Sequence, residues 1–154
     1  MDYILKQFDK PLVKFSATTD TSEPEIQILW MDEENKKLFP LDMTLTPEGL
    51  GRWLRHRTIP KNRAFVHDFL AKSGLNLNRP LGIIDVCKGL SLNDCYWVVK
   101  SGDEASFAQA NLYDNRFSNI LAELAFTGYG SKVRASLFSS PEFTTNGMLR
   151  KCWR

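Results

Sequence analysis

The stretch Leu90-Ser-Leu-Asn-Asp-Cys-Tyr-Trp-Val-Val99 decides the fold, because it marks the point where a loop gives way to a strand. Ser91, with Asp94 three residues later, has the spacing of a helix cap. The aromatic and β-branched residues from Tyr96 onward favour extended structure. We interpret the stretch as a structural junction whose Tyr96 and Trp97 pack two layers together, with a binding ridge as the alternative.

Strand patterns precede this junction. Residues 3–17 hold short apolar runs that are broken by Asp9-Lys10-Pro11, which predicts a hairpin. The charged run 32–37 is most simply the solvated tip of a further hairpin. Between these segments, three alternating apolar residues should share one pleated face: Ile26, Ile28 and Trp30.

Helix signals occupy the middle of the chain. Thr46 can cap a free backbone N–H, Pro47 tolerates a first helical turn, and Glu48 suits the positive end of the helix dipole. The apolar stripe of this helix consists of Leu50, Trp53 and Leu54. Further helices are expected over 61–73, closed by Gly74 in the left-handed conformation, over 81–88, ended by Gly89, and over 119–126.

This order of elements, with strands first and helices next, predicts an α+β fold: a small N-terminal antiparallel sheet with packed short helices. A chain of 154 residues is long enough to bury its own core. We place the α+β module over 1–127. A connection and a glycine-containing loop follow over 128–154.

The composition is that of an ordinary globular protein, with 43% hydrophobic and 25% charged residues. A formal charge of +2 is too weak to indicate nucleic-acid binding by itself. The three cysteines show no zinc-ligand spacing, so we expect reduced thiols and no metal. The first residues lack the pattern of a signal peptide, and no apolar run is long enough to span a bilayer, so we expect a cytoplasmic protein with no membrane partner.

A basic segment follows the first expected helix opening, and no acidic residue lies between positions 51 and 63. If its cations converge, they would attract phosphate or an acidic partner. The alternative is a set of solvated charges that flank Trp53. The candidate contact residues, with His56 among them, are Arg52, Arg55, Arg57, Lys61 and Arg63.

No catalytic constellation emerges from the remaining polar residues. His56 and His67 lie on different expected helices, and no serine or cysteine is placed as a nucleophile. Asp85, Asp94 and Asp103 fall at an expected helix end, a turn and a loop tip. We assign no catalytic residue in this chain.

Near the C-terminus, Thr144-Thr145-Asn146-Gly147 has the character of a phosphate-facing turn. Glycine permits dihedrals that expose consecutive backbone N–H groups, and Lys151 could reach a nucleotide phosphate. The segment matches neither the Walker pattern nor GxGxxG. An ordinary turn is therefore the alternative.

Four stretches together carry a resemblance to a known family. They are Arg57-Thr-Ile-Pro-Lys-Asn-Arg63, Leu90-Ser-Leu-Asn-Asp-Cys-Tyr-Trp97, Asn111-Leu-Tyr-Asp-Asn-Arg-Phe-Ser118 and Ser140-Pro-Glu-Phe-Thr-Thr-Asn-Gly-Met-Leu-Arg-Lys-Cys-Trp-Arg154. They resemble the N-terminal region of HipA-like serine/threonine protein kinases, the toxins of bacterial toxin–antitoxin modules. The similarity covers about residues 46–154.

The resemblance implies a small α+β subdomain in front of a kinase lobe that uses ATP and Mg. It also implies a regulatory loop beside the ATP site, whose hydroxyl residue can be autophosphorylated. Thr144 or Thr145 would hold that hydroxyl, Gly147 would be the loop glycine, and Lys151 the basic residue that follows. Arg150 departs from the family's pattern, which has proline there.

Kinase chemistry needs a lysine for the phosphates, an aspartate for the attacking hydroxyl and metal-binding Asn and Asp residues. None can be placed here, because the resemblance ends where the kinase-like N-lobe begins. We therefore expect a module without activity or cofactor of its own, which packs against a missing kinase lobe and meets an antitoxin, and nucleic acid only indirectly. The alternatives are a separately encoded regulator or antitoxin-like partner acting in trans, and a small phosphate- or nucleotide-binding protein.

A surface made for the missing lobe should be apolar. The candidate residues for this surface are Tyr129, Val133, Leu137, Phe138, Phe143, Met148 and Trp153.

Overall fold

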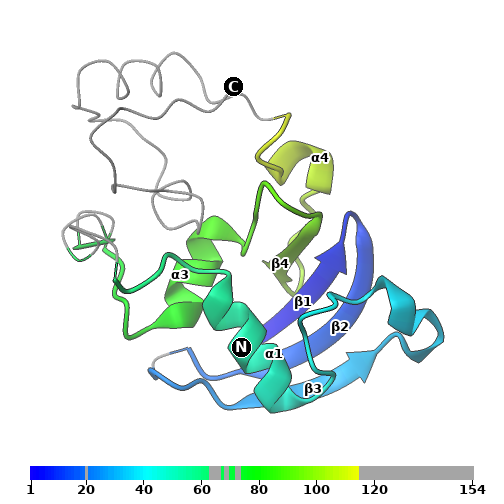
Figure 1. Ribbon diagram of the computed structural model, residues 1–154, viewed down its shortest axis with the longest axis horizontal. Helices are drawn as coiled ribbons and strands as arrows, with labels where there is room; N and C mark the ends of the chain where they lie inside the picture. Colours follow the sequence, from blue (N-terminus) through cyan, green and yellow to red (C-terminus); the bar gives the residue numbers. More distant parts are fainter. Residues whose placement is uncertain (20, 63–66, 68–69, 72–73, 115–154) are drawn as a thin grey trace.

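The computed structural model describes residues 1–19, 21–62, 67, 70–71 and 74–114. Within them, a four-stranded antiparallel sheet in the order β3-β2-β1-β4 carries two helices on one face and a short helix on the other, which is the expected α+β class (Figure 1). The strands are β1 (Asp2–Gln7), β2 (Lys10–Ala17), β3 (Ile26–Met31) and β4 (Tyr96–Lys100). The helices are the 3₁₀ helix η1 (Glu33–Leu38), α1 (Pro47–His56), α3 (Pro80–Cys87) and the short α4 (Phe107–Ala110).

The N-terminal hairpin is confirmed, but its turn lies earlier than the sequence suggests. The chain reverses at Phe8-Asp9, and Pro11 belongs to β2. Proline has no N–H to give to a ladder, and a β-bulge interrupts the pairing here: Leu5 pairs with Val13, and the next residue of β1 pairs with Pro11. The bulge leaves Leu12 as an extra residue, so Leu12 and Val13 are both buried.

A second bulge corrects the expectation for Trp30. Lys14 pairs with Trp30 and Phe15 with Ile28, so Leu29 is the extra residue of β3. The extra residue changes the phase of the strand, because side chains alternate with a period of two. Ile28 packs on the core, whereas Trp30 is 44% exposed.

The charged run after β3 is not a hairpin tip. It forms the 3₁₀ helix η1, in which the side-chain amide of Asn35 donates to both carboxylate oxygens of Asp32. That local bond offers the backbone an alternative to a strand. Lys10 adds an ion pair to Asp32 at 3.5 Å.

Several helix boundaries follow the sequence closely, but Lys61 and Asn62, which were expected to open a helix, form a turn. The Thr46 hydroxyl accepts the Gly49 N–H at 3.1 Å, which opens α1 as expected. Gly74 has φ +69°, and Leu75 N–H donates to Leu70 O at 2.8 Å, a pattern that closes a helix. Parts of the expected helix 61–73 and all of the expected helix 119–126 lie outside the described residues.

β4 separates two hydrophobic clusters, as the sequence predicted for its junction. Tyr96 packs against the larger cluster, which the sheet forms with α1 and α3. Trp97 is fully buried in the smaller cluster on the opposite face, with Phe107 of α4. Successive residues of one strand therefore join two layers.

Candidate functional site at the end of helix α1

The chain turns Arg57 inward just after α1, where it is 8% exposed. Its Nη1 and Nη2 donate to the two carboxylate oxygens of Asp94 at 2.6 and 2.7 Å, in a bidentate pair. Its Nε donates to Gly89 O at 2.8 Å, and Nη2 also donates to Tyr96 O at 3.1 Å. One guanidinium thus joins α1, the turn after α3 and the start of β4.

Packing fixes the plane of this guanidinium. Its central carbon lies 4.9 Å from the centre of the Trp53 ring, and Trp53 meets Tyr96 edge to face at 6.4 Å. Gly89 adopts φ +58°, and a Cβ there would lie 3.5 Å from the Arg57 Cβ. Glycine is therefore the residue suited to this turn, and the turn presents its carbonyl to the arginine.

The Asp94 loop is held by its own side chains, which corrects the expected helix cap. The Ser91 hydroxyl accepts the Asn93 N–H at 3.0 Å, and Asp94 Oδ1 accepts the Tyr96 N–H at 3.1 Å. Both are turns that lead into a strand. The Tyr113 hydroxyl lies 2.5 Å from Leu92 O, and 3.2 Å from the carbonyl oxygen of Asp94.

We call Arg57, Gly89, Asp94, Tyr96 and Tyr113 the Asp94 junction. Sequence reasoning missed this cluster, because 37 residues separate Arg57 from Asp94. One signal in the sequence is the position of Arg57. It does not share the helix face of Arg52 and Arg55. An arginine next to an apolar stripe can be a buried ligand of a carboxylate as well as a surface charge.

The other cations of the basic segment point outward. Arg52, Arg55 and His56 are exposed on α1, and Lys61 is exposed beyond it. We call these four residues the basic face. Arg57 lies apart from them in the Asp94 junction, and Arg63 is outside the described residues.

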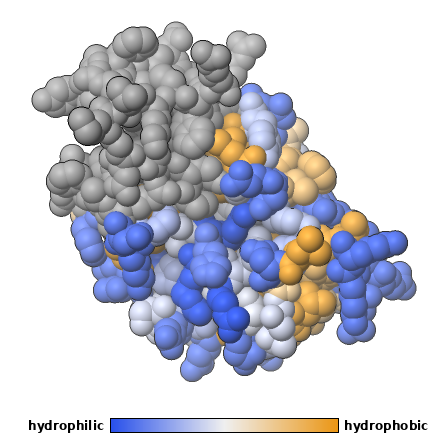
Figure 2. Space-filling view, viewed as in Figure 1, coloured by the Kyte–Doolittle hydropathy of each residue, from blue (hydrophilic) through white to orange (hydrophobic). Residues whose placement is uncertain are grey.

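The charge of the basic face is not neutralised within the described chain. Neither Arg52, Arg55 nor Lys61 forms an ion pair with a described residue. Hydrophilic side chains make up much of the described surface in the lower part of Figure 2, with apolar side chains toward its right-hand edge. The Thr58 hydroxyl donates to Arg55 O at 2.9 Å and holds the end of the helix. The basic face is thus a positive surface carried by α1 and the residues just after it.

The three aspartates considered from the sequence lie apart, each with its own cation. Lys100 pairs with Asp85 at 3.0 Å, and Lys88 with Asp103 at 2.6 Å. The hydrogen bond from Lys88 holds the pKa of Asp103 below its usual value. The Tyr3 hydroxyl donates to Asp85, and burial, followed by the charge of Asp85, raises the pKa of Tyr3. Each of the three carboxylates is thus engaged in an ion pair within the fold.

The other reactive side chains are also dispersed. His56 and His67 are exposed, Cys87 is buried, and burial raises the pKa of the half-buried Cys95 thiol. Among the described residues, no group of three or more His, Cys, Asp or Glu could hold a metal ion. The regulatory-loop residues expected from the resemblance, Thr144, Thr145, Gly147 and Lys151, lie outside the described residues, as do the candidates for an apolar surface.

Comparison with known proteins found no relative. No family model, no curated protein and no solved structure matches the chain at a significant level. In the part of the chain that the structure describes, no helix has the length and apolar character to cross a membrane.

Proposed function

We propose that this chain is the N-terminal regulatory and interaction module of a HipA-like serine/threonine kinase. Its role is to bind the kinase lobe and to support the regulatory loop around Thr144, Thr145, Gly147 and Lys151. ATP and Mg belong to the lobe, and an antitoxin is a further partner. The chain performs no phosphoryl transfer of its own.

One observation carries this proposal: three stretches that resemble the family meet in the Asp94 junction. Arg57 comes from the first, Asp94 and Tyr96 from the second, and Tyr113 from the third. Residues far apart in sequence that share one network form a structural unit. The resemblance therefore falls on residues that depend on one another.

The basic face supplies a surface for the partner. Arg52 and Arg55 lie on α1, and the Asp94 junction holds the C-terminal end of this helix through Arg57. Charged residues at the rim of an interface steer association and select partners. We assign this surface to an acidic region of the kinase lobe or of the antitoxin.

The test is a calorimetric titration of the chain with the HipA-like kinase lobe encoded with it, in the same reading frame or in an adjacent gene. We expect binding, and we expect R52E/R55E to weaken it at least tenfold, because two charges are reversed at the contact. The matched control is K36E/K37E, which makes the same change in charge on exposed residues of η1. It should bind as the wild type does.

Two outcomes would overturn parts of this proposal. Equal weakening by both double variants would show that net charge, and not the basic face, governs association. A folded chain that gives no heat with the lobe would contradict the function itself. The position of the kinase gene separates a module in cis from a regulator in trans.

A further inference from the structure

Among the described residues, no helix covers the face of the sheet opposite α1 and α3 over much of β1, β2 and β3, and Lys14 and Trp30 are exposed there. α4 and its neighbours cover this face beside β4, where Trp97 and Phe107 are buried. On β1, Lys6 alternates with the buried Leu5. On β2, Lys14 alternates with the buried Val13 and Phe15. Lys6 and Lys14 therefore point to the side of the sheet away from the main core.

Two large aromatic side chains are exposed at the ends of this open face. Trp30 is turned outward by the bulge at Leu29 and is 44% exposed. Phe8 continues the alternation of β1 into the turn, has φ +50° and is 55% exposed. The ring of Phe107 meets Phe8 edge-on at 5.2 Å and supports it from one side. Backbone irregularities thus present both rings to solvent.

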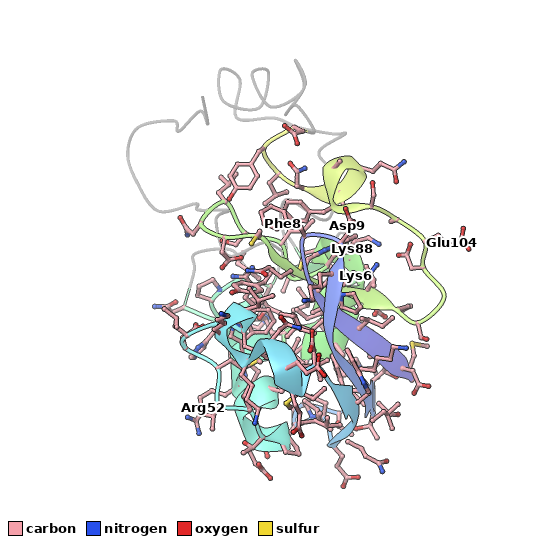
Figure 3. All side chains as sticks on the ribbon, turned by 90° about the vertical axis from the view of Figure 1, so that its right-hand side faces the viewer. Lys6, Phe8, Asp9, Arg52, Lys88 and Glu104 are labelled. Carbon is pink, nitrogen blue, oxygen red and sulfur yellow. The ribbon has the colours of Figure 1, made fainter. Side chains whose placement is uncertain are left out.

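Lysines lie between the two rings. Lys14 Nζ is 6.0 Å from the centre of the Trp30 ring, and Lys6 Nζ is 5.4 Å from that of Trp97. Neither lysine forms an ion pair with a described residue, whereas the nearby Lys88 is paired with Asp103. Lys6 and Phe8 lie together at one end of the sheet, far from Arg52 (Figure 3).

Most acidic residues described around this face are engaged: Asp103, whose charge also acts on Lys6, is paired with Lys88 at 2.6 Å. Asp9 accepts the backbone N–H of Phe107 at 2.7 Å, and Asp32 is paired with Lys10. Asp2 is exposed at the start of β1. The strip from Phe8 through Lys6 and Lys14 to Trp30 is therefore positive, with an aromatic ring at each end.

We propose that this strip binds single-stranded nucleic acid. Trp30 and Phe8 would stack on bases while Lys6 and Lys14 contact phosphates. Four-stranded sheets with helices behind and aromatics in front bind unpaired bases in this way, and stacking with lysine contacts is the general means of single-strand recognition. Strands lie about 4.8 Å apart and rise about 3.4 Å per residue, so the strip suits two or three nucleotides.

An acidic protein would also pair with the lysines, but the alternation of rings and lysines matches the alternation of bases and phosphates along a single strand. A duplex would hide the base faces that the rings require. The inference goes beyond the proposed function, departs from the expectation that nucleic acid is met only indirectly, and uses a different face of the molecule. Either can therefore fail without the other.

The experiment is fluorescence anisotropy of a labelled ten-nucleotide oligo(dT) or oligo(U), titrated with the full chain at low and at moderate salt. We expect binding that weakens as salt is added. In a plot of the logarithm of the binding constant against the logarithm of the salt concentration, each phosphate contact should contribute about 0.7 to the downward slope. Trp30→Ala should weaken it roughly 5- to 100-fold, because one stacked base is lost. Lys14→Gln should lower the salt slope by about 0.7.

R52Q/R55Q, on the helix side, is the control and should leave oligonucleotide affinity unchanged. Circular dichroism melts of every variant establish that the fold is intact, which the exposure of Trp30 and Lys14 favours. The inference is overturned if the wild type binds no oligonucleotide, if folded Trp30→Ala binds as tightly as the wild type, or if duplex of the same sequence binds better. A loss of affinity in R52Q/R55Q alone would move the site to the basic face.

Discussion

Arg57 is buried although it follows two exposed basic residues. Its neighbours Arg55 and His56 are exposed, yet Arg57 is 8% exposed and donates to Asp94 through both terminal nitrogens. Burying a guanidinium is costly unless its donors are satisfied. Contacts with Asp94, Gly89 O and Tyr96 O satisfy most of them and offset that cost.

Removing the carboxylate should therefore be severe. We expect Asp94→Ala to lower the free energy of unfolding by about 3 kcal/mol, because it leaves a buried cation without its partner. Urea denaturation measures this. Lys10→Ala, which removes the more exposed pair with Asp32, should cost less than about 1 kcal/mol. Similar losses in the two variants would mean that the Asp94 junction is no stronger than a surface ion pair.

Tyr3 should make the stability of the fold depend on pH in the alkaline range. Burial raises the pKa of Tyr3 above its ordinary value of 10.0, and its hydroxyl donates to Asp85. A pKa raised by folding contributes stability that is complete below pH 10.0 and is lost as the pH rises through the folded value. The wild type should therefore lose stability in that range by ionisation of Tyr3.

Tyr3→Phe keeps the ring that stacks on Phe15 at 5.5 Å but has no proton to lose. Its stability should fall less steeply above pH 10.0 than that of the wild type. Denaturant melts at several pH values, with the absorbance of tyrosinate as a second reading, compare the two proteins. Identical curves for both would show that Tyr3 does not control this transition.

At the scale of elements, two helical glycines allow a matched comparison. A Cβ on Gly49 would collide with the backbone carbonyl oxygen of Thr44. A Cβ on Gly82 would meet only the Arg79 Cβ at 3.8 Å, an ordinary contact. Replacing a helical glycine by alanine usually raises the stability of the protein. We expect this increase at Gly82 but not at Gly49.

We expect Gly82→Ala to raise the free energy of unfolding by about 0.5–1 kcal/mol. Gly49→Ala should lower it by about 1–3 kcal/mol, since the first turn of α1 must move away from Thr44. Thermal melts of the two variants suffice. A stabilising Gly49→Ala would mean that the start of α1 does not pack against Thr44 as described.

Elements whose signals are local could be predicted from the sequence. Thr46 caps α1 because its hydroxyl lies three residues from the N–H that it accepts, and Gly74 has the expected positive φ. The outward turn of Trp30 was not predictable, because a bulge depends on pairing with β2 as much as on the residues of β3. Nor was the Asp94 junction, since its contacts join distant parts of the chain.

At the scale of the whole molecule, the sheet separates two surfaces. Arg52 of the basic face lies on α1, and Lys6 and Phe8 of the strip lie far from it (Figure 3). Substitutions more than about 7–10 Å apart with no shared partner act independently. R52E/R55E should accordingly weaken binding of the kinase lobe but not of the oligonucleotide. Trp30→Ala should weaken binding of the oligonucleotide but not of the kinase lobe.

The central claim is that the chain supplies a surface and the kinase lobe supplies the chemistry. Transfer of labelled phosphate from ATP with Mg tests it most directly, using the purified chain, the lobe and their mixture. The account predicts no labelled product with the chain alone, and a rate in the mixture that differs from that of the lobe. Phosphate transfer by the purified chain without the lobe would contradict it.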